Sequence, residues 1–222
     1  MVEKRKYINY VTPAGVAIFP RLNKPDTKFN KAGVYSTKLK FKSDDAALIA
    51  FIAKYTKTLD EFENITCEKL LADKKTAKKA SSLERVEIGK PETDDNGDET
   101  GYTLINFKLN ASYTDEKSGK TTTYSPKLFD AKNKATTVAV WGGSTLKVAG
   151  TVNPYYTPKD NQVGISFRLS GVQVINLVSG GGQTAEAMGF ASEEGYEDGG
   201  GFEDAPIEAS TSDEKTAKGA DF

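Results

Sequence analysis

The sequence predicts a mainly β protein with one or two helices inserted among its strands and a separate acidic tail. Three observations predict this class. Short segments rich in β-branched and aromatic residues recur between turn-forming residues, one longer segment has helical spacing, and all periodicity stops after residue 178. A small closed barrel is one architecture without exposed sheet edges, but the pattern does not separate a barrel from a sandwich.

The first strands are expected in "KYINYV", "GVAIFP" and "GVYSTKLKF", which Gly, Pro, Asn and Asp separate. In the last of these, apolar or bulky side chains alternate with Ser36, Lys38 and Lys40. Because successive side chains of a strand point to opposite faces, this alternation indicates a half-buried strand with a basic outer face.

The next segment, "SDDAALIAFIAKYTKTLDEF", is typical of a helix. Ser43 can cap it, and Asp44 and Asp45 in the first turn favour the positive end of the helix dipole. Apolar residues recur at three- and four-residue spacing: Leu48, Phe51, Ile52, Tyr55 and Leu59. One helix face should therefore pack on the sheet. A second, weakly amphipathic helix is expected at about 67–81.

The second half of the body returns to strands. "YTLINFKLNASY" alternates, and "DEKSG" turns the chain into a partner strand, which predicts a hairpin. After the bend at "GGS", the last strands are expected in "TLKVAGTV" and "VGISFRLSGVQVINLV". The linker "NPYYTPKDNQ" between them is interpreted as a loop.

Charge divides the chain into two expected parts, a domain over residues 1–178 and a tail over 179–222. Residues 183–222 hold eleven acidic and two basic residues, a net charge of −9, which leaves +8 on residues 1–182. The tail has too little apolar surface to offset its backbone entropy, so we expect it to be disordered. A basic body with an acidic tail suggests a body that binds a polyanion and a tail that can imitate one, although a merely solubilising tail has the same composition.

Missing residue types exclude several function classes. One cysteine, Cys67, excludes an internal disulfide, and the absence of histidine excludes the usual zinc spacings and His-based catalysis. With no phosphate loop or EF-hand either, we expect a protein that is not an enzyme and needs no cofactor or metal. No apolar run approaches the roughly 18 to 20 residues of a membrane span, and no secretory signal is evident, so a cytoplasmic location is expected.

The strongest candidates for chemistry are Tyr155 and Tyr156, which Pro154 and Pro158 bracket in the expected loop. Exposed aromatics near cations can stack on bases while the cations neutralise phosphates, whereas ordinary packing of one tyrosine and exposure of the other is the alternative. Further candidates are Lys108, Lys147 and Arg168, each on the polar face of a strand by alternation, with Tyr113 as an aromatic neighbour. Trp141 is expected to lie in the core rather than to serve as a platform.

Several stretches together resemble the single-stranded DNA-binding proteins of short-tailed, T-odd-type bacteriophages. They are "NKPD" with "GVYSTKLKF", "DNGDETGYTLINFKLNASYTDEKSGKTTTYSPKLFDAKNK", "GGSTLKVAGTVNPYYTPKDNQVGISFRLSGVQVINLV", and an acidic tail ending in "ADF". They occur in the same order and span most of the chain. The resemblance implies an OB-fold, a five-stranded Greek-key barrel with an inserted helix, and a homodimer that binds single strands without sequence preference.

The resemblance also implies roles for individual residues. The loop tyrosine that follows proline in the family corresponds to Tyr155, the basic residue of its "FK" strand to Lys108, and its terminal aromatic to Phe222. The family's basic residue before "GVY" falls on Ala32, one position after Lys31. Lys31, Lys38 and Lys40 complete the expected DNA-binding set, and Asp221 joins Phe222 in the expected partner-binding set.

The resulting hypothesis is a phage-encoded single-stranded DNA-binding protein of DNA replication, recombination and repair, acting in the host cytoplasm. Its basic, aromatic-lined groove would hold DNA, and its tail would compete for that groove and recruit the phage DNA polymerase and helicase/primase. One alternative is a replication interaction hub whose barrel binds protein or double-stranded nucleic acid. Another is a nuclease dependent on lysine or carboxylates, which would cleave strands with Mg²⁺.

Overall fold

The computed structural model describes residues 8–178, which form a mainly β structure with two helices. This confirms the predicted fold class at that level. The elements follow in chain order: β1 (Ile8–Val11), β2 (Gly15–Asp26), β3 (Val34–Lys42), α1 (Ala46–Ala72), α2 (Ala77–Ala80), β4 (Glu84–Arg85), β5 (Lys90–Thr93), β6 (Glu99–Asn110), β7 (Ser112–Thr114), β8 (Thr121–Thr123), β9 (Lys127–Phe129), β10 (Thr145–Thr157) and β11 (Gln162–Asn176).

Five long strands pair in a circuit. β10 pairs with β2, β2 with β3, β3 with β6, β6 with β11, and β11 with β10 again. All these pairings are antiparallel except β6 with β11, which is parallel. Two of these strand pairings are short: β2 and β10 share two residue pairs, and so do β6 and β11. Each strand of the circuit has one apolar side and one polar side.

The apolar side forms one core. Alternate residues of the five strands are almost fully buried, among them Leu39, Phe107, Leu146, Val148 and Leu169. Aromatic rings of β1, α1, β6 and β11 join them: Tyr10, Phe51, Tyr55, Phe107 and Phe167 pack with centroid separations of 4.9 to 6.3 Å. Burial raises the pKa of the Tyr10 phenol above its ordinary value, and its hydroxyl donates to the Arg168 carbonyl at 3.2 Å. The polar face therefore lies on strands whose other side is closely packed in the core.

The first predicted helix forms, but its start differs from the prediction. The residue that caps α1 is Asp45, whose Oδ1 accepts hydrogen bonds from the backbone N–H groups of Ala47 at 2.7 Å and Leu48 at 3.0 Å. Ser43 lies before the cap, where its hydroxyl contacts that of Thr103 at 2.8 Å. Asp44 and Asp45 therefore precede the first turn. The predicted buried face is confirmed for Leu48, Phe51, Tyr55 and Leu59, while Ile52 is half-buried.

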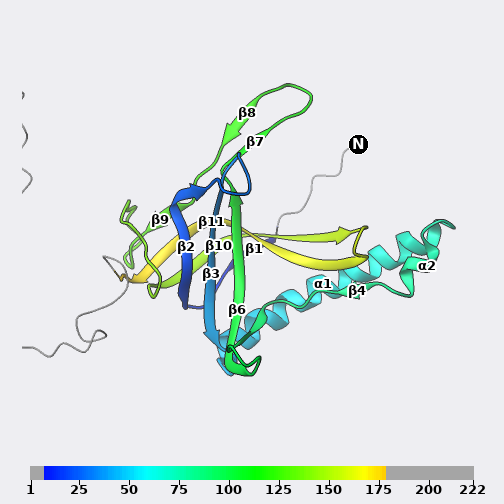
Figure 1. The fold of residues 1–222 in the computed structure, drawn as a ribbon, viewed down its shortest axis with the longest axis horizontal. Coiled ribbons are helices and arrows are strands. Elements are labelled where there is room, and N and C mark those ends of the chain that lie inside the picture. The colour runs from blue at the N-terminus through cyan, green and yellow to red at the C-terminus, as the bar shows by residue number, and fades with distance from the viewer. Residues whose placement is uncertain (1–7, 179–222) are drawn as a thin grey trace, which may run out of the picture. The chain divides into compact units, whose positions relative to one another are not determined.

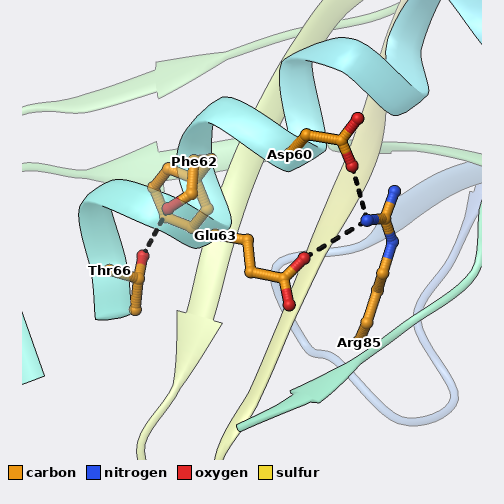
Figure 2. Close-up of polar contacts among 5 residues, drawn as sticks. All are labelled: Asp60, Phe62, Glu63, Thr66 and Arg85. Atoms are coloured by element: carbon orange, nitrogen blue, oxygen red, sulfur yellow. Dashed lines mark hydrogen bonds and ion pairs between the residues drawn. The ribbon is translucent and has the colours of Figure 1, made fainter. Parts of the chain in front are cut away.

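The prediction of a second helix at about 67–81 is confirmed only in part. Its first residues continue α1 to Ala72, and only the four residues of α2 are helical beyond it. Thr66 lies inside α1, where its hydroxyl donates to the Phe62 carbonyl one turn earlier at 2.8 Å, as Figure 2 shows. The apolar face continues past Thr66 to the buried Leu70.

The segment from α1 to β4, which we call the helical insertion, contacts the β10–β11 hairpin, which runs alongside α1 (Figure 1). Arg85 of β4 lies 2.5 Å from Asp60 and 3.2 Å from Glu63 of α1, and Figure 2 shows both carboxylates converging on one guanidinium nitrogen. The hydrogen bond that Arg85 donates to the Asp60 carboxylate raises the pKa of Arg85. β4 in turn pairs with β11, so β4 connects α1 to the hairpin.

The region between the last strands differs from the predicted loop. β10 extends to Thr157 and β11 begins at Gln162, so Tyr155 and Tyr156 lie in a strand, and only Pro158–Asn161 form the turn. Pro154 is tolerated because, among residues 8–178, β10 pairs only with β11 in this part of the hairpin. Trp141 is 47% exposed, so the expectation of a core tryptophan is also wrong.

The predicted "DEKSG" hairpin is confirmed. β7 and β8 pair in register from Ser112↔Thr123 to Thr114↔Thr121. Asp115 accepts hydrogen bonds in the turn from the backbone N–H groups of Lys117 at 3.1 Å and Ser118 at 2.7 Å, and these bonds lower the pKa of its carboxyl group. The turn is thereby ordered by its own side chain, and it holds the hairpin that carries Tyr113.

Candidate nucleic-acid interface

Five residues that are partners across neighbouring strands form a row on the polar face. Arg21 of β2 lies opposite Ser36 of β3, Ser36 opposite Lys108 of β6, Lys108 opposite Arg168 of β11, and Arg168 opposite Thr151 of β10. Side chains of such partners are about 5 Å apart at Cβ. Three of the five are cations and all three are exposed. We call this set the cross-strand row.

A cleft of about 500 Å³ lies at the β10 end of the cross-strand row. We call it the first cleft. It is lined by Lys108, Asn110, Tyr113, Tyr124, Thr151, Val152, Asn153, Ser166, Phe167 and Arg168. The structure thus brings together three predicted site residues, Lys108, Tyr113 and Arg168.

The aromatic walls of the first cleft are Tyr113 and Tyr124, which are 59% and 37% exposed. The Arg168 guanidinium lies over the Tyr124 ring, 5.5 Å from its centroid. The Tyr124 backbone N–H donates to the Ala111 carbonyl at 2.8 Å, which holds Tyr124 beside the start of the β7–β8 hairpin. A cation and two partly exposed rings therefore share one concave surface.

Tyr155 and Tyr156 lie on opposite sides of the hairpin. Tyr155 lies across its partner Gly164, where an added Cβ would come within 2.6 Å of the tyrosine hydroxyl oxygen. It follows Asn153 by two residues, so it shares the outward face that borders the first cleft. Tyr156 faces the other way, packs against the core and donates its hydroxyl hydrogen bond to Asn161 at 3.0 Å. Of these two tyrosines, Tyr155 therefore lies on the face of the first cleft, although it is not among the residues that line it, and Tyr156 lies on the opposite face.

Asn161 links the hairpin turn to the helical insertion. It adopts a left-handed backbone with φ of 52°, and its side-chain amide donates to the carbonyls of Lys79 at 2.9 Å and Ser82 at 2.7 Å. Lys79 returns a bond of 2.7 Å from Nζ to the Pro158 carbonyl. These contacts hold the hairpin end, and with it Tyr155, in a defined place.

Lys40 is separated from the cross-strand row by a partner of its own. Its Nζ lies 2.6 Å from a Glu92 carboxylate oxygen and 4.1 Å from the centroid of the Tyr102 ring. The hydrogen bond from Lys40 lowers the pKa of Glu92, because it favours the ionised carboxylate. Lys40 lines none of the described clefts that hold Lys108.

The other predicted lysines lie in three different places. Lys38 is exposed on β3 and lines a second cleft, which is described below. Lys31 is exposed in the turn between β2 and β3. Lys147 is half-buried on β10 opposite Gln173, before the irregularity at Ala149 and Gly150, and does not line the first cleft. Asp221 and Phe222 lie outside the described residues.

Sequence reasoning missed Arg21 and Tyr124. Alternation along "GVAIFPRL" does not place Arg21, because an irregularity between Ile18 and Arg21 shifts the register of β2. Tyr124 follows β8 directly, and only the polar run "TTTY" within the predicted hairpin could have pointed to an exposed ring. Within residues 8–178 no group of acidic and cysteine side chains is arranged to hold a metal ion, and no helix is long and apolar enough to cross a membrane.

Comparison with known proteins decides the family. The model of the family described as the single-stranded DNA-binding protein of bacteriophage T7 matches residues 15–177. The chain belongs to this family. Its members are binding proteins, which confirms the expectation of a protein that is not an enzyme and the resemblance read from the sequence.

Three relatives each cover at least 75% of the chain. A single-stranded DNA-binding protein of Enterobacteria phage T3 is 27% identical over 170 residues, which are 75% of this chain and 72% of that protein. The crystal structure of gp2.5, a single-stranded DNA-binding protein encoded by bacteriophage T7, has a TM-score of 0.63 at 23% identity and covers 87% of this chain and 100% of its own. The single-stranded DNA-binding protein of bacteriophage Enc34, solved in complex with single-stranded DNA, has a TM-score of 0.45 at 16% identity, covering 76% and 86% of the two chains.

Proposed function

We propose that the protein binds single-stranded DNA without sequence preference, in phage DNA replication, recombination and repair. The observation that carries this proposal is the cross-strand row with its three exposed cations beside the aromatic first cleft. Arg21, Lys108 and Arg168 would neutralise phosphates, while Tyr113 and Tyr124 would stack on bases. The family and the T3 relative support single strands as the ligand.

The chemistry of this surface accounts for binding that ignores sequence. Every base has a π face, so aromatic stacking is worth about 1 to 3 kcal/mol per base whatever the base. Cations on phosphates carry no sequence information. Duplex DNA stacks its bases internally and cannot offer them to Tyr113 or Tyr124. Single strands should therefore bind more tightly than duplexes.

The proposal extends to the fold. We infer that the circuit of β2, β3, β6, β10 and β11 is the five-stranded OB-fold barrel, with α1, α2 and β4 as its insertion. The return of the pairing to β10, the parallel contact between β6 and β11, and the TM-score with the T7 protein support this assignment. In OB-folds the strand face and its loops bind oligonucleotides, which agrees with the position of the first cleft.

The remaining expectations complete the proposal. Residues 1–178 would form the DNA-binding domain, and the acidic residues 179–222 would compete for its groove and recruit the phage DNA polymerase and helicase/primase through Asp221 and Phe222. The protein would act as a homodimer in the host cytoplasm. The net charge of −9 over residues 183–222 against +8 over the remainder supports the competition.

The binding proposal is tested by fluorescence anisotropy of a labelled oligo-dT strand and of a mixed-sequence duplex of equal length at low salt. We expect tighter binding to the single strand and equal affinities for single strands of different base composition. Equal or tighter duplex binding would instead favour the interaction hub, and strand cleavage on adding Mg²⁺ would favour the nuclease.

Deletion of residues 183–222 tests the tail. If these residues compete with DNA, the shortened chain should bind oligo-dT at least several-fold more tightly at low salt, and the difference should shrink as salt screens the competition. Unchanged or weaker binding by the shortened chain contradicts the competition.

A further inference from the structure

A second cleft lies on the same polar face, at the other end of the cross-strand row. It has a volume of about 400 Å³ and is formed by β2, β3 and β6. Its lining consists of Ile18, Phe19, Arg21, Asp26, Ser36, Thr37, Lys38, Asn106, Phe107 and Lys108. Lys108 lines both clefts, so the two are neighbours along the row.

Phe19 is displayed in the second cleft by an irregularity of β2. Ile18 pairs with Lys38 and Arg21 with Ser36, so two residues, Phe19 and Pro20, lie opposite the single residue Thr37. Such a bulge changes the direction of a side chain. Pro20 has no N–H group and could not take part in a regular ladder at this position.

The Phe19 backbone is held in an unfavourable conformation. Its φ is 47°, in the left-handed region that bulky residues rarely adopt, and the following proline further restricts it. Phe19 gains no burial in return, because 81% of its surface is exposed. Backbone strain of this kind clusters where a side chain serves a ligand.

The charge around Phe19 suits a polyanion. Three cations line the cleft, Arg21, Lys38 and Lys108, against one carboxylate, Asp26. Asp26 already accepts a hydrogen bond from the Lys28 backbone N–H at 2.8 Å. Proteins that bind single-stranded nucleic acids combine exposed aromatic rings with nearby cations in this way.

We propose that Phe19 is a stacking platform for a second nucleobase, so that one DNA strand runs from the first cleft past Lys108 into the second. This deepens the proposed function and rests on it. The ring stacks one base, Arg21 and Lys38 hold the flanking phosphates, and the bulge fixes the ring in the path of the strand.

Phe29 provides a matched control. It is 91% exposed and also has a lysine over its ring, with the Lys28 Nζ 5.3 Å from the ring centroid, but it lines neither the first nor the second cleft. The full chain and the variants F19A, F19W and F29A are titrated with oligo-dT of about 15 nucleotides, a length that covers an OB-fold site. Thermal melting of each variant checks the fold.

The expected result is about a tenfold loss of affinity in F19A, with F29A unchanged and F19W retaining the wild-type value, because a tryptophan also stacks. A strand carrying 5-iodo-deoxyuridine should crosslink to Phe19, located by mass spectrometry of the peptides. If F19A melts early, this crosslink on the unaltered chain decides alone.

Three results overturn the proposal: equal affinities of F19A and F29A, crosslinks to the first cleft without Phe19, or a change in sedimentation of F19A with DNA affinity preserved. The last would assign Phe19 to a protein contact. A parallel R168A variant distinguishes a failure of the Phe19 proposal from a failure of the proposed DNA-binding function. Lost binding in R168A with normal binding in F19A rejects only the second subsite, whereas normal binding in both rejects DNA binding by this face.

Discussion

At the residue scale, Arg168 combines the most roles. Its side chain lies over Tyr124, its backbone pairs with Lys108 and Thr151, and its carbonyl accepts from the buried Tyr10 hydroxyl. The backbone of Arg168 is thus anchored to the core through its carbonyl, while its side chain lies on the polar face. Lys40 differs from Arg168, because its ammonium group already forms an ion pair with the Glu92 carboxylate.

This contrast gives the first prediction. Arg168→Ala should weaken oligo-dT binding about tenfold, because a charged hydrogen bond is worth about 1.5 to 3 kcal/mol. Lys40→Ala should change it less than about twofold, as expected for a cation already paired at the surface. Anisotropy titration measures both, and equal losses in the two variants would contradict the role of the cross-strand row.

The two adjacent tyrosines give the second prediction. Tyr155→Ala should lower DNA affinity about fivefold or more through lost stacking, with little change in melting temperature. Tyr156→Phe should do the reverse. It removes the hydrogen bond to Asn161 and costs about 1 kcal/mol of unfolding free energy, while DNA affinity is kept. Denaturant unfolding and anisotropy on both variants check the assignment, and a larger DNA effect in Tyr156→Phe would reverse it.

At the element scale, the close approach of β10 and β11 below Arg168 depends on Gly150. A Cβ on Gly150 would lie 1.8 Å from the Arg168 carbonyl oxygen and 3.0 Å from the Tyr10 hydroxyl oxygen. Neither neighbour can move easily, since one is strand backbone and the other a buried ring. The irregularity between Ala149 and Gly150 therefore requires a residue without a side chain at position 150.

Gly150→Ala should thus destabilise the protein by about 3 kcal/mol, at the upper end of the usual cost of overpacking. Gly142→Ala is the control, because the nearest atom to its added Cβ is the Ala17 carbonyl oxygen at an ordinary 3.8 Å. Chemical denaturation of the two variants gives the difference, and similar midpoints would show that the hairpin can adjust.

Much of this architecture could be predicted from the sequence, and the errors have physical causes. Alternation placed Lys108 and Arg168 on polar faces, because a strand with one buried face must alternate. Pro154 and Pro158 suggested a loop around Tyr155, yet Pro154 lies in β10 opposite Ile165, and the strand positions that tolerate proline depend on pairing that a single sequence does not show. The bulge at Phe19 and the pairing of Lys40 with Glu92 depend on the same unseen pairing.

At the scale of the whole molecule, binding should be governed by charge. The five-strand circuit gathers Arg21, Lys108 and Arg168, from three strands distant in sequence, into the cross-strand row. Each cation that neutralises a phosphate releases about 0.7 of a counterion from a single strand. Affinity should therefore fall linearly on logarithmic axes as salt rises, with a slope that counts the phosphate contacts.

The measurement that tests this account most directly is the salt dependence of oligo-dT binding by the wild type and by the triple variant with Arg21, Lys108 and Arg168 replaced by alanine. If all three cations contact phosphates, the variant's slope should be shallower by about 2, since each contact contributes about 0.7. The Lys40→Ala variant should keep the wild-type slope. An unchanged slope in the triple variant would show that DNA does not bind across this row.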